Sequence, residues 1–199
     1  MRIKYINYLL SLVAIIGSFY IIVVKDRELG VILKDASILV TITLPYILEK
    51  IFKIKIDNKL KFLYILFVFC AHFLGATVEL YNKISWYDKL CHTLSGVLTS
   101  YGALLILTFI KNCNIENKFF NIMYMICVTL AVASLWEIFE YTANILFGGD
   151  AQKVAQRGVN ETMQDIIVAF IGSLFVCLIY GFYSTLNIFN FTNSVKKID

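Results

Sequence analysis

The sequence predicts an all-α, polytopic transmembrane helical bundle, and three observations lead to this prediction. First, the chain of 199 residues is 59% hydrophobic and 16% charged, with a mean hydropathy of +0.75, whereas soluble domains are about 45–50% apolar and about 25% charged. Second, several runs of about 20 residues carry almost no charge, which is the length that crosses the roughly 30 Å hydrocarbon core of a bilayer. Third, the chain contains one proline and lacks the alternating segments of about ten residues that form transmembrane β-barrels.

Hydropathy along the chain predicts six membrane-spanning helices. In order, they cover about residues 5–24, 29–48, 61–81, 90–110, 119–147 and 162–184. The first follows a basic start, but its apolar run is too long for a signal peptide and no A-x-A cleavage site follows, so we expect a permanent helix. Short charged connectors such as KDRE, EKIFKIKIDNKLK and KNCNIENK bound the others. Because no connector is long enough to join two domains, we expect a single membrane domain over residues 1–199, with a core site region at 79–180.

The distribution of lysine and arginine predicts which side of the membrane each end faces, because cytoplasmic loops carry an excess of these residues. With both termini in the cytoplasm, eleven basic residues lie on that side and seven on the other. The connector from Lys50 to Lys61 supplies most of the difference. We therefore expect both termini to be cytoplasmic.

The third to sixth predicted helices each carry polar and small residues at intervals of three and four, which places them on one face of each helix. These residues are His72, Gly75, Glu79 and Lys83; His92, Gly96 and Thr99; Ala133, Glu137, Glu140 and Asn144; and Glu161, Asp165, Ala169 and Gly172. Small residues let helix backbones approach one another. At about 1.5 Å of rise per residue, we expect the polar side chains of the last three helices to meet in the outer half of the membrane.

Glu137 and Glu140 are the first candidates for a functional site. Inserting a carboxylate at the centre of a bilayer costs roughly 2.5 kcal/mol or more. Two carboxylates on one helix face call for a compensating partner, a proton or a cation. We expect them to surround one cavity, open to the outer face, together with Asp88, His92 and Asp165. The predicted metal-ligand set is His92, Glu137, Glu140 and Asp165, an oxygen-rich group with one imidazole that suits zinc, manganese or iron. Asp88, four residues before His92, is placed to orient the imidazole ring.

Charge in this region decides which ligands fit it. The two segments 79–92 and 137–165 together contain seven acidic and four basic residues. Their net charge is −3, although the whole chain carries +4. Such a pocket favours protons, metal ions or cationic ligands. Simpler interpretations stay open: Thr162 and Asp165 resemble a capping box, Trp136 is typical of an interfacial aromatic, and His72 is expected to be a packed, hydrogen-bonded residue.

Three segments carry a resemblance to a known family: ELYNKISWYDKLCHTLSG, SLWEIFEY and ETMQDIIVAFIGS. Together they resemble the YjdF-type membrane-spanning proteins of bacteria and, more distantly, the VanZ-like proteins. The matching residues are Trp86, Tyr87, Asp88, His92, Ser95 and Gly96; Trp136, Glu137 and Glu140; and Thr162, Met163, Asp165 and Gly172. Glu161 stands where the pattern has Asp, and Gln164 where an aromatic residue is common. The resemblance covers about residues 79–180 and implies an architecture and a site, but no reaction; the VanZ-like relatives suggest a link to the cell envelope.

Three functions fit these observations. The first is a metal-dependent membrane hydrolase that acts on a lipid or cell-envelope substrate, with a divalent metal ion as cofactor. The second is a proton- or cation-coupled transporter or binding protein, and the third is a structural or regulatory membrane protein whose buried acids are hydrogen-bonded. The expected partners are the lipid bilayer, a lipid or cationic ligand and a second copy of the chain, with no nucleic acid, and the expected location is the bacterial cytoplasmic membrane, crossed several times.

Overall fold

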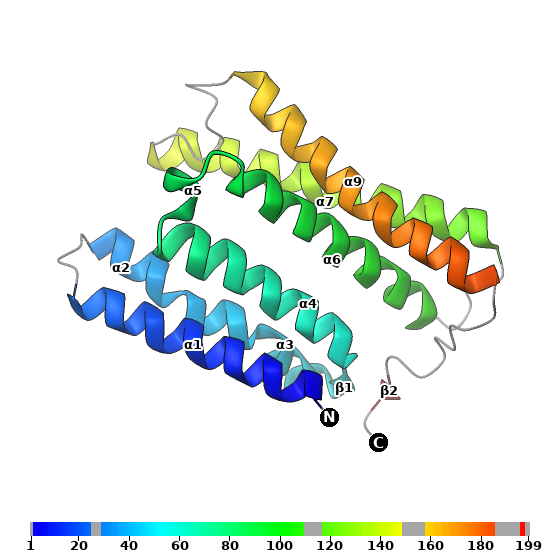
Figure 1. Ribbon diagram of the computed structural model, residues 1–199, viewed down its shortest axis with the longest axis horizontal. Helices are drawn as coiled ribbons and strands as arrows, with labels where there is room; N and C mark the ends of the chain where they lie inside the picture. Colours follow the sequence, from blue (N-terminus) through cyan, green and yellow to red (C-terminus); the bar gives the residue numbers. More distant parts are fainter. Residues whose placement is uncertain (1, 25–28, 110–116, 149–157, 186–195, 198–199) are drawn as a thin grey trace. The chain divides into compact units, whose positions relative to one another are not determined.

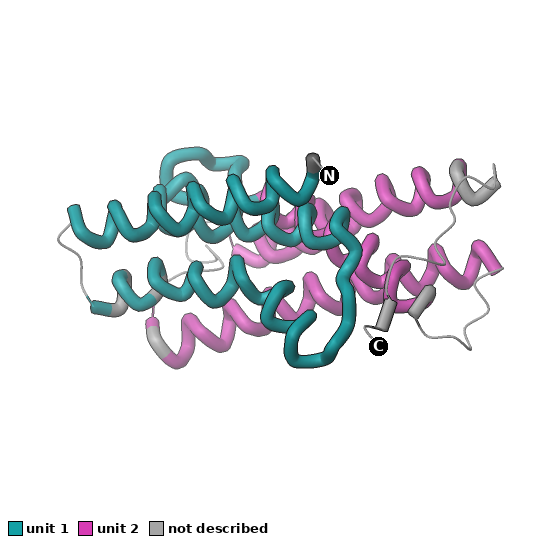
Figure 2. The backbone as a smooth tube through the Cα atoms, turned by 90° about the horizontal axis from the view of Figure 1, so that it is seen from below, with its two compact units in different colours: residues 1–88, 193–199 teal, residues 89–192 magenta. Residues whose placement is uncertain are grey.

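The fold is almost entirely helical, as the sequence predicts (Figure 1). The computed structural model describes residues 2–24, 29–109, 117–148, 158–185 and 196–197. Its elements are α1 (Arg2–Val24), α2 (Leu29–Ala36), α3 (Ile38–Phe52), β1 (Ile54–Lys55), α4 (Asn58–Val68), the π-helical segment η1 (Phe69–Thr77), α5 (Leu80–Lys83), α6 (Tyr87–Phe109), α7 (Lys118–Phe147), α9 (Val159–Thr185) and β2 (Lys196–Lys197). The chain groups into two compact units, residues 1–88 with 193–199 and residues 89–192 (Figure 2). The single membrane domain over 1–199 stays a prediction.

Five of the six predicted spans correspond to helices long and apolar enough to cross a membrane. These are Ile3–Val24, Asn58–Thr77, Tyr87–Leu107, Lys118–Leu146 and Val159–Phe182 within the described residues. The chain is therefore an integral membrane protein with several spans. Some basic residues of the charge count, Lys25, Arg27, Lys111, Lys153 and Arg157, lie outside the described residues.

The second predicted span, 29–48, is formed by α2 and α3 in series. Ser37 lies between them. Its backbone has right-handed helical dihedrals, its N–H donates to the Leu33 carbonyl, and its own carbonyl accepts from the Thr41 N–H at 3.1 Å. The backbone therefore continues in a helical path from Leu29 to Phe52, 24 residues that at about 1.5 Å each reach across the hydrocarbon core.

Pro45, buried inside α3, shapes the same segment. Proline has no N–H, so the carbonyl four residues earlier loses its helical partner. That carbonyl belongs to Thr41, and the hydroxyl of Tyr64 on α4 donates to it at 2.8 Å. One side-chain hydrogen bond thus replaces the missing backbone bond and joins α3 to α4.

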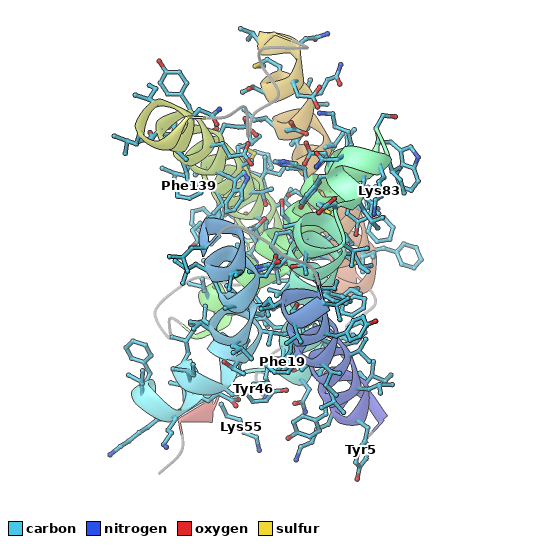
Figure 3. The ribbon with its side chains drawn as sticks, turned by 90° about the vertical axis from the view of Figure 1, so that its left-hand side faces the viewer. Tyr5, Phe19, Tyr46, Lys55, Lys83 and Phe139 are labelled. Atoms are coloured by element: carbon cyan, nitrogen blue, oxygen red, sulfur yellow. The ribbon has the colours of Figure 1, made fainter. Side chains whose placement is uncertain are left out.

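The first unit packs around an apolar core. Its buried members are Ala14, Ile38, Ile42, Ile65, Val68 and Phe73. The opposite face of α1 carries large apolar side chains that suit contact with lipid, among them Tyr5 and Phe19, which are 65% and 68% exposed (Figure 3).

The third predicted span, 61–81, ends earlier than expected. Helix α4 continues into η1, which stops at Thr77, and Glu79 adopts a left-handed backbone with φ 68°. The Thr77 hydroxyl donates to a carboxylate oxygen of Asp35 at 2.9 Å, which ties this end of η1 to α2. The expectation that Glu79 and Lys83 continue the helical stripe of His72 is therefore wrong. His72 itself is hydrogen-bonded to Ser37 and Thr41, as expected of a packed residue.

Strands β1 and β2 bring the chain's C-terminal segment to the connector between α3 and α4. Ile54 pairs with Lys197 and Lys55 with Lys196 in an antiparallel register. Segments paired in this way lie on one side of a membrane, which agrees with the predicted topology for these two regions. The cytoplasmic location of both termini stays a prediction.

Candidate functional site

Helices α6 and α9 of the second unit run parallel and in very close contact. A Cβ atom on Gly96 would lie 2.7 Å from the carbonyl carbon of Ala169, and one on Gly172 would lie 3.1 Å from the Val97 nitrogen. Only residues without a side chain allow backbones to come this near. The close approach brings the first turns of both helices, which carry the charged residues, side by side.

Lys89 is the centre of a buried ion-pair network between these helices. Its ammonium lies 2.8 Å from Oε1 of Glu161 and 2.8 Å from Oδ1 of Asp165. The two acidic side chains are 2% and 5% exposed, and that of Lys89 is 18% exposed. A buried carboxylate is costly without a partner, and here one ammonium compensates two of them.

His92 and Asp88 extend this network along α6. His92 lies one turn after Lys89, and its Nε2 is 3.8 Å from the same Oδ1 atom of Asp165. Asp88 lies four residues before His92 on the same unbroken helix. One ligand atom from each of Asp88, His92 and Asp165 lies within 4.8 Å of the other two, so these three side chains could hold a metal ion.

Side-chain hydrogen bonds fix how the helices are aligned below the network. Ser173 on α9 donates to Ser100 on α6 at 3.2 Å, and Thr99 donates to Thr129 on α7 at 3.3 Å. His92 precedes Ser100 by eight residues, and Asp165 precedes Ser173 by eight. Both therefore lie about 12 Å from this hydroxyl layer.

Glu137 is placed at the same level by the same argument. It follows Thr129 by eight residues on α7. This helix runs antiparallel to α6 and α9, because Asn121, which precedes Thr129, donates at 2.7 Å to the hydroxyl of Tyr180, which follows Ser173. Glu137 is therefore also about 12 Å from the hydroxyl layer, and it is 5% exposed. A buried carboxylate thus lies at the depth of His92 and Asp165, on the third helix of the unit.

Glu140 occupies a different environment. It is half-buried and accepts a 2.8 Å hydrogen bond from the indole N–H of Trp136, one turn earlier on α7. In the group of possible metal ligands found among the described residues, neither Glu140 nor Glu137 takes part. The structure thus brings together Asp88, His92 and Asp165, and it gives the two glutamates separate surroundings.

Lys89 and Glu161 are the site residues that the sequence argument did not select. Both were counted in the local charge balance, and Lys89 stands three residues before His92 on the same helix face. Glu161 also stands where the family pattern has an acid. The signal for both was present, but the sequence alone does not show that one lysine reaches two acids on another helix.

The comparisons with known proteins place this arrangement in a family. The family described as "Predicted membrane protein (DUF2238)" matches residues 6–185, and that range contains every residue of the network. The chain belongs to this family. Membership is consistent with the YjdF-type pattern, whereas the likeness to VanZ-like proteins has no support.

One relative matches part of the chain. An uncharacterized protein of Thermotoga maritima is 29% identical over 130 residues, which cover 64% of this chain and 65% of that protein. The chain therefore spans just under two thirds of the length of the curated relative. No solved structure gives a significant match.

Proposed function

We propose that this DUF2238 protein is a bacterial cytoplasmic-membrane protein that binds a divalent metal ion through Asp88, His92 and Asp165. The observation that supports the proposal is the convergence of three ligand atoms within 4.8 Å, two of them on buried side chains. Two carboxylates and one imidazole are donors typical of zinc, manganese or iron sites. This set shares His92 and Asp165 with the set expected from the sequence, in which Glu137 and Glu140 are the other ligands.

The reaction that suits such a site is hydrolysis of a lipid or cell-envelope substrate. Three protein ligands leave coordination positions for water and a substrate oxygen, and a metal lowers the pKa of bound water. In this proposal Lys89 holds Asp165 in place, as hydrogen-bonded neighbours of metal ligands do, and Glu161 in turn holds Lys89. Glu137, buried at a similar depth on α7, is the proton acceptor in this proposal.

Metal analysis of protein purified without added metal tests the proposal. We expect about one metal ion per chain in the native protein, and a loss of at least tenfold in occupancy for His92→Ala and Asp165→Asn. Glu140→Gln is the matched control, because the Glu140 carboxylate is bonded to Trp136. We expect this variant to keep its metal ion. Native protein without metal, or variants with full occupancy, would contradict the metal site.

A cation- or proton-coupled function is the second candidate, and the Lys89 network favours it. An ammonium already lies against Asp165 at 2.8 Å, where it neutralises the carboxylate that a metal would use. In this alternative a proton or cationic solute exchanges with Lys89 on the two acids. Ligand-dependent proton uptake by metal-free protein supports this candidate over the hydrolase.

A further inference from the structure

The inner face of α1 carries polar side chains that neither the metal site nor the Lys89 network uses. Asn7, Ser11 and Ser18 follow one another at intervals of four and seven, which places them on one side of the helix. Asn7 and Ser18 are 1% and 2% exposed. In the part of the chain that the structure describes, the Asn7 Oδ1 and the hydroxyls of Ser11 and Ser18 have no hydrogen-bond partner. Buried polar atoms are almost always bonded to protein, water or an ion, so these atoms point to a ligand.

A buried carboxylate lies in the same unit. Asp35 on α2 and Thr77 at the end of η1 are both fully buried, and the Thr77 hydroxyl donates to Oδ1 of Asp35 at 2.9 Å. Ionisable residues inside a membrane protein are costly and mark ion or proton sites by default.

Chain geometry places Ser18 at the level of this pair. Ser18 lies six residues before the end of α1 at Val24, and Asp35 lies six residues after the start of α2 at Leu29. Both are therefore about 9 Å along their helices from the connection between α1 and α2. A Cβ atom on Gly17, next to Ser18, would lie 2.7 Å from Cε2 of Phe73, so this part of α1 packs directly against η1.

The local backbone is also unusual. Segment η1 is π-helical, with the Val78 N–H bonded to the carbonyl of Phe73 five residues earlier. Short π-helices are rare and occur frequently at functional sites, and membrane proteins place ion sites at irregular helices.

We propose that Asp35, Thr77 and Ser18 form a site for a small monovalent cation, a sodium ion or a proton, within the first unit. Carboxylate and hydroxyl oxygens are the donors that hard cations prefer. Both ring nitrogens of His72 are hydrogen-bonded, one to the Ser37 hydroxyl and the other to the Thr41 hydroxyl. We therefore assign no nitrogen ligand to the site, and its ligand atoms are all oxygens.

The same face of α1 carries further buried polar side chains toward its N-terminal end. Asn7 and Ser18 are about 16 Å apart along the helix, and Ser11 lies between them. The site is independent of the proposed metal function, because it shares no residue with Asp88, His92 and Asp165.

Thermal unfolding in detergent, followed by intrinsic fluorescence, tests the sodium arm. Sodium chloride replaces choline chloride at constant ionic strength. A bound ion raises the melting temperature by a constant step for each tenfold increase in concentration above its dissociation constant. We expect this rise in the native protein, a loss of at least tenfold in sodium affinity in Ser18→Ala and Thr77→Val, and no sodium effect in Asp35→Asn.

Vesicles loaded with a pH-sensitive dye test the proton arm. An imposed potassium diffusion potential drives protons inward, and we expect a proton flux with the native protein. This flux should fall at least tenfold in Asp35→Asn. It should fall equally in Thr77→Val, a substitution that leaves the net charge of the chain unchanged. Ser173→Ala, which removes a buried serine hydroxyl in the second unit, is the matched control and changes neither readout.

The outcomes separate this proposal from the metal site. Asp165→Asn removes a metal ligand and leaves the sodium or proton effect intact. A sodium-dependent rise identifies sodium as the ion, and Asp35-dependent flux without that rise identifies the proton. The cation site would be overturned if the native protein showed neither the sodium-dependent rise nor the proton flux. It would also be overturned if Ser18→Ala and Thr77→Val kept the full effect of the native protein.

Discussion

Replacing Gly96 by alanine tests the close packing of α6 and α9. The added Cβ would lie 2.7 Å from the Ala169 carbonyl carbon, whereas two carbon atoms in ordinary contact are about 3.5–4.0 Å apart. The helices must therefore separate by about 1 Å at this point. The Ser173–Ser100 bond, one turn away and already 3.2 Å long, would then exceed hydrogen-bonding distance.

We expect Gly96→Ala to lower the free energy of unfolding by about 1–3 kcal/mol, the usual cost of overfilling a packed interior. The matched control is Gly181→Ala on α9, where a Cβ meets nothing within 4 Å and alanine is the better helix former. Titration of the folded protein with sodium dodecyl sulfate in mixed micelles, followed by tryptophan fluorescence, measures both. Equal stability of Gly96→Ala and Gly181→Ala would refute the close contact.

Three further predictions follow from single contacts. Lys89→Met leaves two buried carboxylates without their ammonium, so we expect the same titration to show a loss of about 3–5 kcal/mol, and a loss below 1 kcal/mol would contradict the buried network. Tyr64→Phe removes the donor to the carbonyl that Pro45 leaves unbonded, at a cost of about 1 kcal/mol; in the Pro45→Ala background, where a backbone N–H is restored, that cost should disappear. Lys55 precedes α4 and Lys83 follows η1, and both side chains are exposed (labelled in Figure 3). Single cysteines at these positions should differ in labelling by an impermeant reagent added outside intact cells, with Lys83→Cys reacting and Lys55→Cys protected; the reverse result would contradict the predicted topology.

Most of the fold could be predicted from the sequence because a bilayer accepts few structures. Backbone polar groups must be bonded internally in lipid, so long apolar runs become helices. Helix α7 was expected at 119–147 and is observed at Lys118–Phe147. The early end of η1 could not be predicted, since it comes with a left-handed backbone at Glu79, a conformation that a non-glycine residue seldom adopts.

The candidate site was predictable in depth but not in pairing. Helical spacing and rise predicted only that His92, Glu137 and Asp165 lie in the outer half of the membrane, and the hydroxyl bonds of the second unit narrow this to a similar distance from one hydroxyl layer. Which acid meets which base depends on helix rotation and side-chain length. Glu137 and Glu140 are three residues apart on α7. Glu137 is nevertheless buried, whereas Glu140 accepts a hydrogen bond from Trp136.

The pairing of Lys89 with acids on α9 has a consequence for how the protein is made. During synthesis α6 enters the membrane before α9, so for a time Lys89 has neither Glu161 nor Asp165 beside it. Lys89 is the third residue of α6, close enough to the end of the span for its long side chain to keep the ammonium in the interfacial region while it waits. The ion pairs of Lys89 with Glu161 and Asp165 therefore form only after α9 has been made.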